Sequence, residues 1–170
     1  MDANVKGSIN TDDSTAGGIV GVNNSDVTIR DSSFEGNLGV VGDEGFYLGG
    51  LIGSNVRDTT ATISNSYATG SYNGPASSIG GLIGYSFQAT TDVEDSYFSG
   101  DITNGREVGG IIGRGGLNIS NSYAEASIEG YGDSGGILGS GTTNMENSYF
   151  EGAVETTSEK DSAGGVGGNV

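Results

Sequence analysis

A Gly-Gly pair followed by apolar residues and a further glycine recurs along this chain at nearly constant intervals. Five copies have two aliphatic residues before the third glycine, and a shorter sixth copy has one. The copies begin at Gly17, Gly49, Gly80, Gly109, Gly135 and Gly164. Steps of 26 to 32 residues separate them. A period in this range is typical of stacked structural repeats, in which no single unit can bury its apolar face alone.

A second motif lies between the glycine motifs and completes the repeat. It reads Asn or Asp, then Ser, then usually Tyr, as in Asn65-Ser66-Tyr67. Apolar residues stand two positions before it and again a few positions after it, so that each repeat offers three short apolar segments. Gly, Asn, Asp and Ser separate these segments, and such residues favour tight turns. The glycine density and the lack of a 3.6-residue apolar period exclude helix.

These patterns predict an all-β fold, a right-handed parallel β-solenoid (β-helix). We expect about five and a half coils of 26–32 residues with three short strands per coil. The hand follows from the strong right-handed preference of parallel β crossovers. Residues 1–170 are interpreted as a single domain, which divides into a partial coil 1–16, coils 17–48, 49–79, 80–108, 109–134 and 135–163, and a partial coil 164–170.

Alignment of the repeats predicts which side chains point inward. The position after the tyrosine alternates between large and small residues, as a narrow, close-packed interior requires. It is occupied by Phe34, Ala68, Phe98, Ala124 and Phe150. Val5 falls in the same column and Ile9 in that of Leu38. The preceding Asn or Asp is expected at a corner with a left-handed backbone, and the serine beside it in a hydroxyl ladder from coil to coil.

Composition excludes several classes of partner. The net charge is −16, with six basic and 22 acidic residues. Binding of nucleic acid requires clustered Lys and Arg, so neither nucleic acid nor an anionic membrane is an expected partner. No apolar run approaches the roughly 20 residues of a membrane span, so membrane insertion is not expected. Without cysteine, no zinc–thiolate site can form. Met1-Asp2 is not followed by a basic and apolar leader, and the chain reads as a mature fragment or a segment of a longer protein.

The paired motifs, most clearly Gly49-Gly50-Leu51-Ile52-Gly53 followed by Ile63-Ser64-Asn65-Ser66-Tyr67-Ala68-Thr69-Gly70, resemble the GLUG repeat. That repeat occurs in bacterial and archaeal surface proteins, in adhesins, and in the non-catalytic region of some immunoglobulin A-cleaving metallopeptidases. The resemblance implies an extracellular or cell-surface location and an adhesin-like architecture. It does not imply peptidase activity, because the zinc motif of those enzymes needs two histidines and this chain has none.

Candidate catalytic and metal-binding carboxylates are few. Parallel β-helices can carry catalytic carboxylates on one face, and the candidates are Asp92, Glu94 and Asp95 and the pair Asp43 and Glu44. Without histidine no Ser-His or Cys-His nucleophile can be built, and we expect the protein not to be an enzyme. Calcium could bind weakly in turns at Asp12 and Asp13 or at Asp43 and Glu44. Solvated turns are the alternative, and no cofactor is expected.

Two rows of side chains are candidate binding surfaces. An outward row of aromatic residues could stack on sugar rings or on another protein, or the rings could stack on one another and contact nothing else. This row consists of Tyr67, Tyr97, Tyr123 and Tyr149.

The second row consists of the second aliphatic residue of each glycine motif. If the strand stays regular, it forms an exposed association stripe, and if the glycines bend the chain, it does not. The stripe consists of Val20, Ile52, Ile83, Ile112 and Leu138.

Two further patterns are weaker. A flat face with regular threonines could bind ice, but the threonines here are irregular and are expected in loops; they are Thr28, Thr59, Thr60, Thr62, Thr90, Thr91, Thr142 and Thr143. Asn23 and Asn118 match the three-residue pattern for N-glycosylation.

These observations favour a non-enzymatic extracellular or cell-surface β-solenoid that serves as an adhesin-like stalk or display module. Its partners would be neighbouring protein modules or copies of itself, and also surface glycans. One alternative is a subunit that assembles into an extracellular fibre through open solenoid ends. Another is a flat face that binds carbohydrate or ice.

Overall fold

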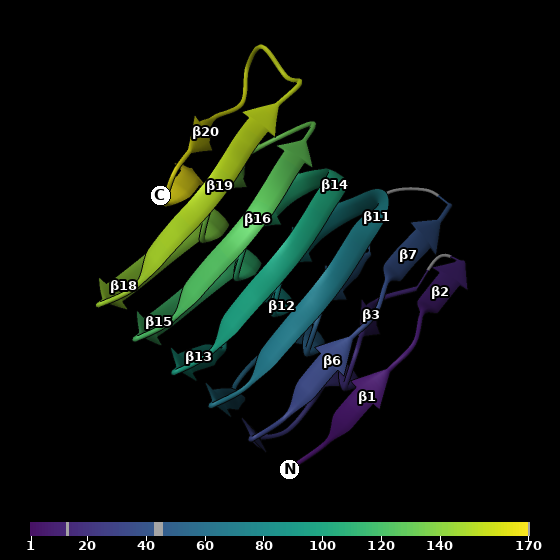
Figure 1. Ribbon diagram of the computed structural model, residues 1–170, viewed down its shortest axis with the longest axis vertical. Coiled ribbons are helices and arrows are strands. Elements are labelled where there is room, and N and C mark those ends of the chain that lie inside the picture. Colours follow the sequence, from purple (N-terminus) through teal and green to yellow (C-terminus); the bar gives the residue numbers. More distant parts are fainter. Residues whose placement is uncertain (13, 43–45, 170) are drawn as a thin grey trace.

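The computed structural model describes residues 1–12, 14–42 and 46–169, and these form a parallel β-solenoid (Figure 1). Every pairing between strands is parallel and joins residues about one repeat apart, as between β11 and β14. Along one path of the larger sheet, the strands β1, β6, β11, β14, β16 and β19 follow one another in six layers. The predicted all-β solenoid is thus confirmed. None of the described residues forms a helix that could cross a membrane.

The strands belong to two sheets. The larger sheet contains β1 (Asn4–Lys6), β2 (Ile9–Asp12), β3 (Ala16–Gly17), β6 (Ser33–Glu35), β7 (Leu38–Val41), β8 (Tyr47–Gly49), β11 (Tyr67–Gly80), β14 (Tyr97–Gly109), β16 (Tyr123–Gly130), β17 (Ser134–Gly135), β19 (Tyr149–Thr156) and β20 (Ala163–Gly164). The smaller sheet contains β4 (Val20–Asn23), β5 (Val27–Arg30), β9 (Ile52–Asn55), β10 (Thr60–Ser64), β12 (Ile83–Ser86), β13 (Thr90–Glu94), β15 (Ile112–Ser120), β18 (Leu138–Glu146) and β21 (Gly167–Asn169).

Three strands per coil are found where β9, β10 and β11, or β12, β13 and β14, succeed one another, although β11 extends over 14 residues and β14 over 13. The first full coil instead divides into five shorter strands, β4 to β8.

The core is a column of alternating large and small side chains, as predicted. Phe34 pairs with Ala68, Ala68 with Phe98, and Phe98 with Ala124, and all four are fully buried. Val5 pairs with Phe34 and Ile9 with Leu38, so the expected register at the beginning of the chain is also confirmed.

The aliphatic stripe is buried, which corrects the interpretation of Val20, Ile52, Ile83, Ile112 and Leu138 as an association surface and agrees with the alternative in which the glycines bend the chain. The last four side chains have no exposed area, and Val20 is half-buried against the core. The chain turns between β8 and β9, where the amides of Leu51 and Ile52 both donate to the carbonyl of Leu82, over 2.9 and 3.0 Å. Strand alternation is interrupted at this turn, and so two successive aliphatic residues both enter the core.

The glycine pair allows this turn to pack closely. A Cβ on Gly80 would lie 1.8 Å from the carbonyl oxygen of Ile83. A Cβ on Gly81 would lie 2.0 Å from the carbonyl oxygen of Gly110 and 2.3 Å from Cγ of Phe98. The second glycine of the pair therefore faces the aromatic column across a core only one side chain thick.

The corner at the start of each Asn/Asp-Ser motif has the left-handed backbone that its Asn or Asp predicted. The φ angles are 51° at Asp31, 48° at Asn65, 47° at Asp95, 48° at Asn121 and 47° at Asn147. Asn and Asp tolerate this conformation better than other residues with a side chain.

The serine beside each corner forms a ladder, but its donors are backbone amides rather than hydroxyls alone. The amide of Ser66 donates to Oγ of Ser96 over 3.1 Å, and that hydroxyl donates to the carbonyl of Glu94 over 2.7 Å. Ser32, Ser66, Ser96 and Ser122 repeat the first contact with the next coil over 3.0 to 3.1 Å. Because these serines are buried, each hydroxyl satisfies an amide that water cannot reach.

Tyr72 fills the space that the small Ala68 leaves in its layer. Its ring lies between Phe34 and Phe98, with centroid distances of 6.4 and 5.1 Å. The side chain is fully buried, and its hydroxyl has no hydrogen-bond partner among the described residues. Burial therefore raises the pKa of Tyr72 far above its ordinary value.

Gly81→Ala is expected to lower the free energy of unfolding by about 1–3 kcal/mol, because the added methyl group overpacks the core against Phe98. Gly21→Ala is the matched control, since its Cβ would meet no atom closer than 3.9 Å. Urea denaturation of both variants measures the difference. Equal losses at the two positions would contradict a steric role for the second glycine.

Tyr72→Phe is expected to raise the free energy of unfolding by about 1 kcal/mol, because it removes a buried hydroxyl that has no partner. The raised pKa adds a pH dependence. Below the ordinary pKa of 10.0 the phenol is neutral in both the folded and the unfolded chain, but above it the unfolded chain loses the proton and the folded chain keeps it, so the free energy of unfolding of the wild type falls as the pH rises. Denaturation between pH 8 and 11 should therefore show a shallower alkaline decline in Tyr72→Phe than in the wild type.

Candidate functional surfaces

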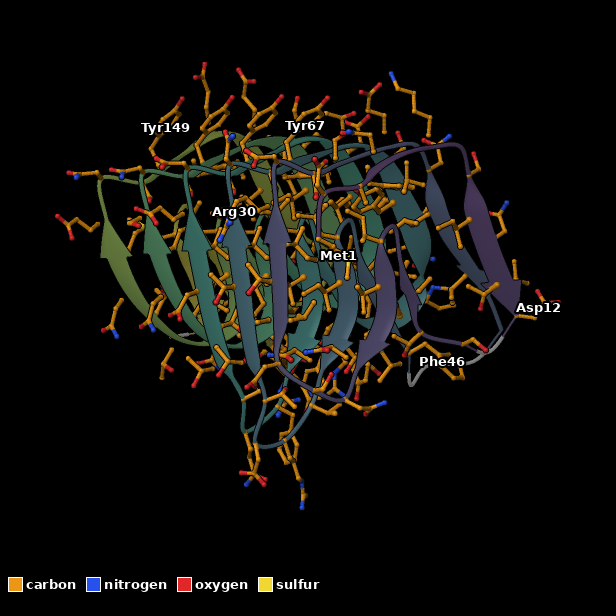
Figure 2. All side chains as sticks on the ribbon, turned by 90° about the horizontal axis from the view of Figure 1, so that it is seen from below. Met1, Asp12, Arg30, Phe46, Tyr67 and Tyr149 are labelled. Carbon is orange, nitrogen blue, oxygen red and sulfur yellow. The ribbon has the colours of Figure 1, made fainter. Side chains whose placement is uncertain are left out.

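The four tyrosines of the predicted row form one continuous stack on the outside of the larger sheet. Centroid distances are 5.0 Å between Tyr67 and Tyr97, 5.0 Å between Tyr97 and Tyr123, and 5.1 Å between Tyr123 and Tyr149. The interplanar angles are 3° to 5°. Figure 2 shows Tyr67 and Tyr149 projecting from the same side of the body. Register alone accounts for this geometry, because the four residues are direct partners in β11, β14, β16 and β19.

The stacking of the rings limits which parts of the tyrosine row can contact a ligand. Each inner ring has a neighbouring ring on both faces, so only ring edges and hydroxyls face solvent. Tyr149, at the end of the stack, is 53 % exposed. A sugar that binds by stacking needs a free ring face, and the inner rings do not offer one. The geometry therefore favours the alternative in which the tyrosines stabilise the sheet.

Polar groups fix the other end of the tyrosine stack. The hydroxyl of Tyr67 donates to Glu35 over 2.9 Å, and Nζ of Lys6 lies 2.8 Å from the same carboxylate. The hydrogen bond from Lys6, followed by that from Tyr67, holds the pKa of Glu35 below its ordinary value. Partial burial, followed by the neighbouring phenols, raises the pKa of Tyr97 and Tyr123.

Among the candidate catalytic carboxylates, Asp92 and Glu94 lie two residues apart on one strand and line the same groove. Asp92 lies on β13 and accepts a hydrogen bond from Asn118 over 2.7 Å. Glu94 is exposed on the same strand, and Asp95 occupies the left-handed corner. Asp43 and Glu44 lie outside the described residues. Asp92 and Glu94 line a shallow groove of about 440 Å³ across β10, β13, β15 and β18, where Asp92, Asn118 and Asn144 bond to one another from coil to coil.

The candidate calcium turns are only partly described. Asp12 ends β2 and is exposed, whereas Asp13 lies outside the described residues, as do Asp43 and Glu44. Among residues 1–12, 14–42 and 46–169, no three acidic side chains gather closely enough to hold a metal ion.

Most of the threonines lie on strands rather than in loops, which corrects the expectation from sequence. Thr60 pairs with Thr90 and Thr62 with Thr28, and these four side chains point outward from the smaller sheet. Thr59 and Thr91 are instead buried. The outward array is irregular because Asp92 and Asn118 continue the column of Thr62. A regular threonine face is therefore not formed.

The two glycosylation patterns differ in access. Asn23 is 5 % exposed, and its amide donates to Asn55 over 2.8 Å, so it is closed to modification in the folded protein. Asn118 is exposed, but its side chain bonds to both Asp92 and Asn144.

A second aromatic cluster was not predicted from the sequence. Tyr47 stacks on Tyr85 at 4.3 Å, Tyr85 on Phe87 at 5.9 Å, and the guanidinium of Arg57 lies 4.9 Å from the Phe87 ring centroid. These residues come from β8, β12 and the segments next to β9 and β12. Their positions in the repeat differ, so alignment of the coils does not group them. The sequence feature that could have indicated this cluster is the unequal length of the segments after Asn55 and Ser86.

Tyr123→Ser is expected to lower the free energy of unfolding by about 1–3 kcal/mol, since it removes two stacked pairs of about 0.5–1.5 kcal/mol each. Tyr149→Ser removes one pair from an exposed position and should cost about half as much. Urea denaturation compares them. Equal and negligible effects would show that the stack does not stabilise the sheet.

Comparison with known proteins identifies part of the repeat. Residues 44–73 and 75–103 match the family described as the GLUG motif. No match was found among curated proteins or among solved structures. The matched segments run from β8 into the first half of β14 and supply the central coils of the stack. The resemblance read from the sequence is thus confirmed for these two segments, which match the GLUG motif and form coils of the β-solenoid.

Proposed function

We propose that this protein is a rigid, non-catalytic structural module, a stalk or display element of an extracellular or cell-surface protein. The tyrosine stack carries the proposal, because its outward side chains are engaged with the coils above and below. The serine ladder and the Asp92–Asn118–Asn144 series repeat that arrangement at other positions. Such contacts resist bending and sliding between coils and leave few side chains free for chemistry.

The repeat geometry also suits a spacer. Each coil adds about 4.8 Å along the axis, and each depends mainly on its two neighbours, so that length can be set by coil number. The GLUG resemblance supports the surface location. The net charge of −16 supports a well-solvated exterior that resists non-specific association.

Rigidity can be measured directly, because the chain has no cysteine. Ser8 and Ala153 are exposed and occupy one column, five coil steps apart, since both precede paired residues in β2, β7, β11, β14, β16 and β19. Spin labels at Ser8→Cys and Ala153→Cys should give a narrow distance distribution centred on about 24 Å plus the label arms. A broad distribution would refute the rigid stalk.

Location has a separate test. Antibodies raised against the purified chain should label intact producing cells as strongly as permeabilised ones. Labelling that requires permeabilisation would refute the surface role without affecting the rigidity measurement.

End-to-end assembly is a second candidate, favoured by one observation. Lys6 and Glu151 occupy the same outward column on the two terminal edges of the larger sheet, and a copy stacked in register would bring these opposite charges together. The edge strands at both ends carry backbone groups to which another coil can add.

A further inference from the structure

Two members of the aromatic cluster, Arg57 and Phe87, lie on segments that project from the body, whereas Tyr47 and Tyr85 lie on β8 and β12. Residues 56–59 connect β9 to β10, and residues 87–89 connect β12 to β13. Figure 2 shows two blue and teal loops extending below the strands, on the side opposite Tyr67 and Tyr149. The segments lie against each other, because the amide of Asp58 donates to the carbonyl of Gln88 over 3.1 Å and that of Phe87 donates to the carbonyl of Asn55 over 3.0 Å.

A buried polar network holds the base of these segments. Asn55 is fully buried, accepts hydrogen bonds from Asn23 and Thr59 over 2.8 Å each, and donates to the carbonyl of Thr90 over 3.3 Å. Ser86 and Thr91, also buried, bond to each other over 2.8 Å. The projecting residues are therefore presented on an ordered base, which lowers the entropy lost when they bind a partner.

The projecting segments, together with the tyrosines of β8 and β12 beside them, have the composition of an interface. We call Tyr47, Arg57, Asp58, Tyr85 and Phe87 the aromatic ridge. Phe87 is 36 % exposed and Arg57 is exposed. The other large apolar side chains with comparable exposure among the described residues are Met1, Val22, Val41, Met145, Tyr149 and Val166, all in the first or last coils. Aromatic residues and Arg are enriched in protein interfaces and in their energetic centres.

The charges of the ridge point to its occupant. Arg57 and Asp58 are adjacent and both exposed, and the ion pairs described in the structure join other residues, Lys6 to Glu35 and Arg114 to Glu107. A two-fold axis through the ridge would place Arg57 of each copy beside Asp58 of the other and bring the two Phe87 rings together. Two-fold pairing of one self-complementary patch is the commonest form of homo-oligomer.

We propose that two copies of this chain associate side by side through their aromatic ridges. The interaction goes beyond the stalk function, because it joins neighbouring stalks laterally rather than lengthening one. It also differs from end-to-end stacking in using the middle coils of the solenoid.

This contact is weak for free molecules. Exposed ion pairs contribute about 0–1 kcal/mol each and an aromatic pair about 0.5–1.5 kcal/mol, and the net charge of −16 opposes approach. Stalks tethered to one surface meet at effective concentrations that reach the millimolar range for short linkers. At such effective concentrations, a weak contact between two ridges is sufficient for neighbouring stalks to associate.

Sedimentation velocity at about 0.15 M salt, where the charges are largely screened, tests the proposal from micromolar to millimolar protein. The wild type should show concentration-dependent dimers. Phe87→Ser and Arg57→Glu should each weaken dimerisation about tenfold or more. Tyr149→Ser and Arg30→Glu, which remove an exposed aromatic ring and reverse an exposed charge away from the ridge, are the matched controls and should dimerise like the wild type. Circular dichroism and urea midpoints confirm that each variant is folded.

A mixing experiment tests the two-fold geometry. Arg57→Glu places two acids against two acids, and Asp58→Lys places two cations against two cations, so each variant alone should fail to pair. In a mixture of the two variants, the introduced glutamate of one faces the introduced lysine of the other, and the unchanged arginine faces the unchanged aspartate. Dimers should therefore return.

Three outcomes would overturn the proposal. The first is a wild type that stays monomeric at every concentration. The second is loss of association in Tyr149→Ser, which would indicate end-to-end stacking. The third is a loss of dimerisation in Arg30→Glu equal to that in Arg57→Glu, which would indicate that the overall charge controls association and the ridge does not.

Discussion

Parallel pairing in register at about 4.8 Å is the constraint on which the rest of this structure depends. Each residue lies against the residues one repeat away, and so a side chain must be compatible with its own column before it can serve any other purpose. Tyrosines in one column become a stack, serines become an amide-capping ladder, and asparagines bond amide to amide. The same rule penalises like charges in adjacent coils. Lys6 and Glu35 are adjacent in their column, with opposite charges and an ion pair.

The thinness of the core is the second constraint, and the glycine pairs make such a thin core possible. In the first five pairs the second glycine lies where any Cβ would enter the Phe/Ala column, as at Gly18 beside Phe34 and Gly136 beside Phe150. The sheets can therefore approach closely enough for one layer of side chains to fill the interior. The cost appears at Tyr72, whose ring fills the space beside Ala68 while its hydroxyl is left without a partner among the described residues.

The sequence predicted the features that recur in every repeat, but it did not predict those that arise where the repeat is interrupted. The Phe/Ala column, the left-handed Asn/Asp corner and the register of Val5 all follow from aligned positions. The direction of Ile52 and its equivalents did not, because two successive inward side chains require a bend that alternation alone cannot reveal. The aromatic ridge was missed for a related reason. Tyr47, Tyr85 and Phe87 occupy different repeat positions, and they meet only because β8 and β12 lie on either side of a turn between neighbouring coils. The tyrosine row was predicted as a surface, but its closed ring faces depend on centroid distances that sequence does not supply.

Alternation in the core has a consequence for how such a chain can change length by recombination between repeats. Exchange at the Asn-Ser corner joins equivalent columns and keeps every ladder intact, since each coil presents the same amides and hydroxyls there. Loss of a single coil would nevertheless set Phe34 directly against Phe98, or Ala68 against Ala124, and break the large–small order that fills the interior. Loss or gain of two coils preserves that order. Packing therefore favours growth and shrinkage of this solenoid in pairs of coils, although its hydrogen bonds repeat with every one.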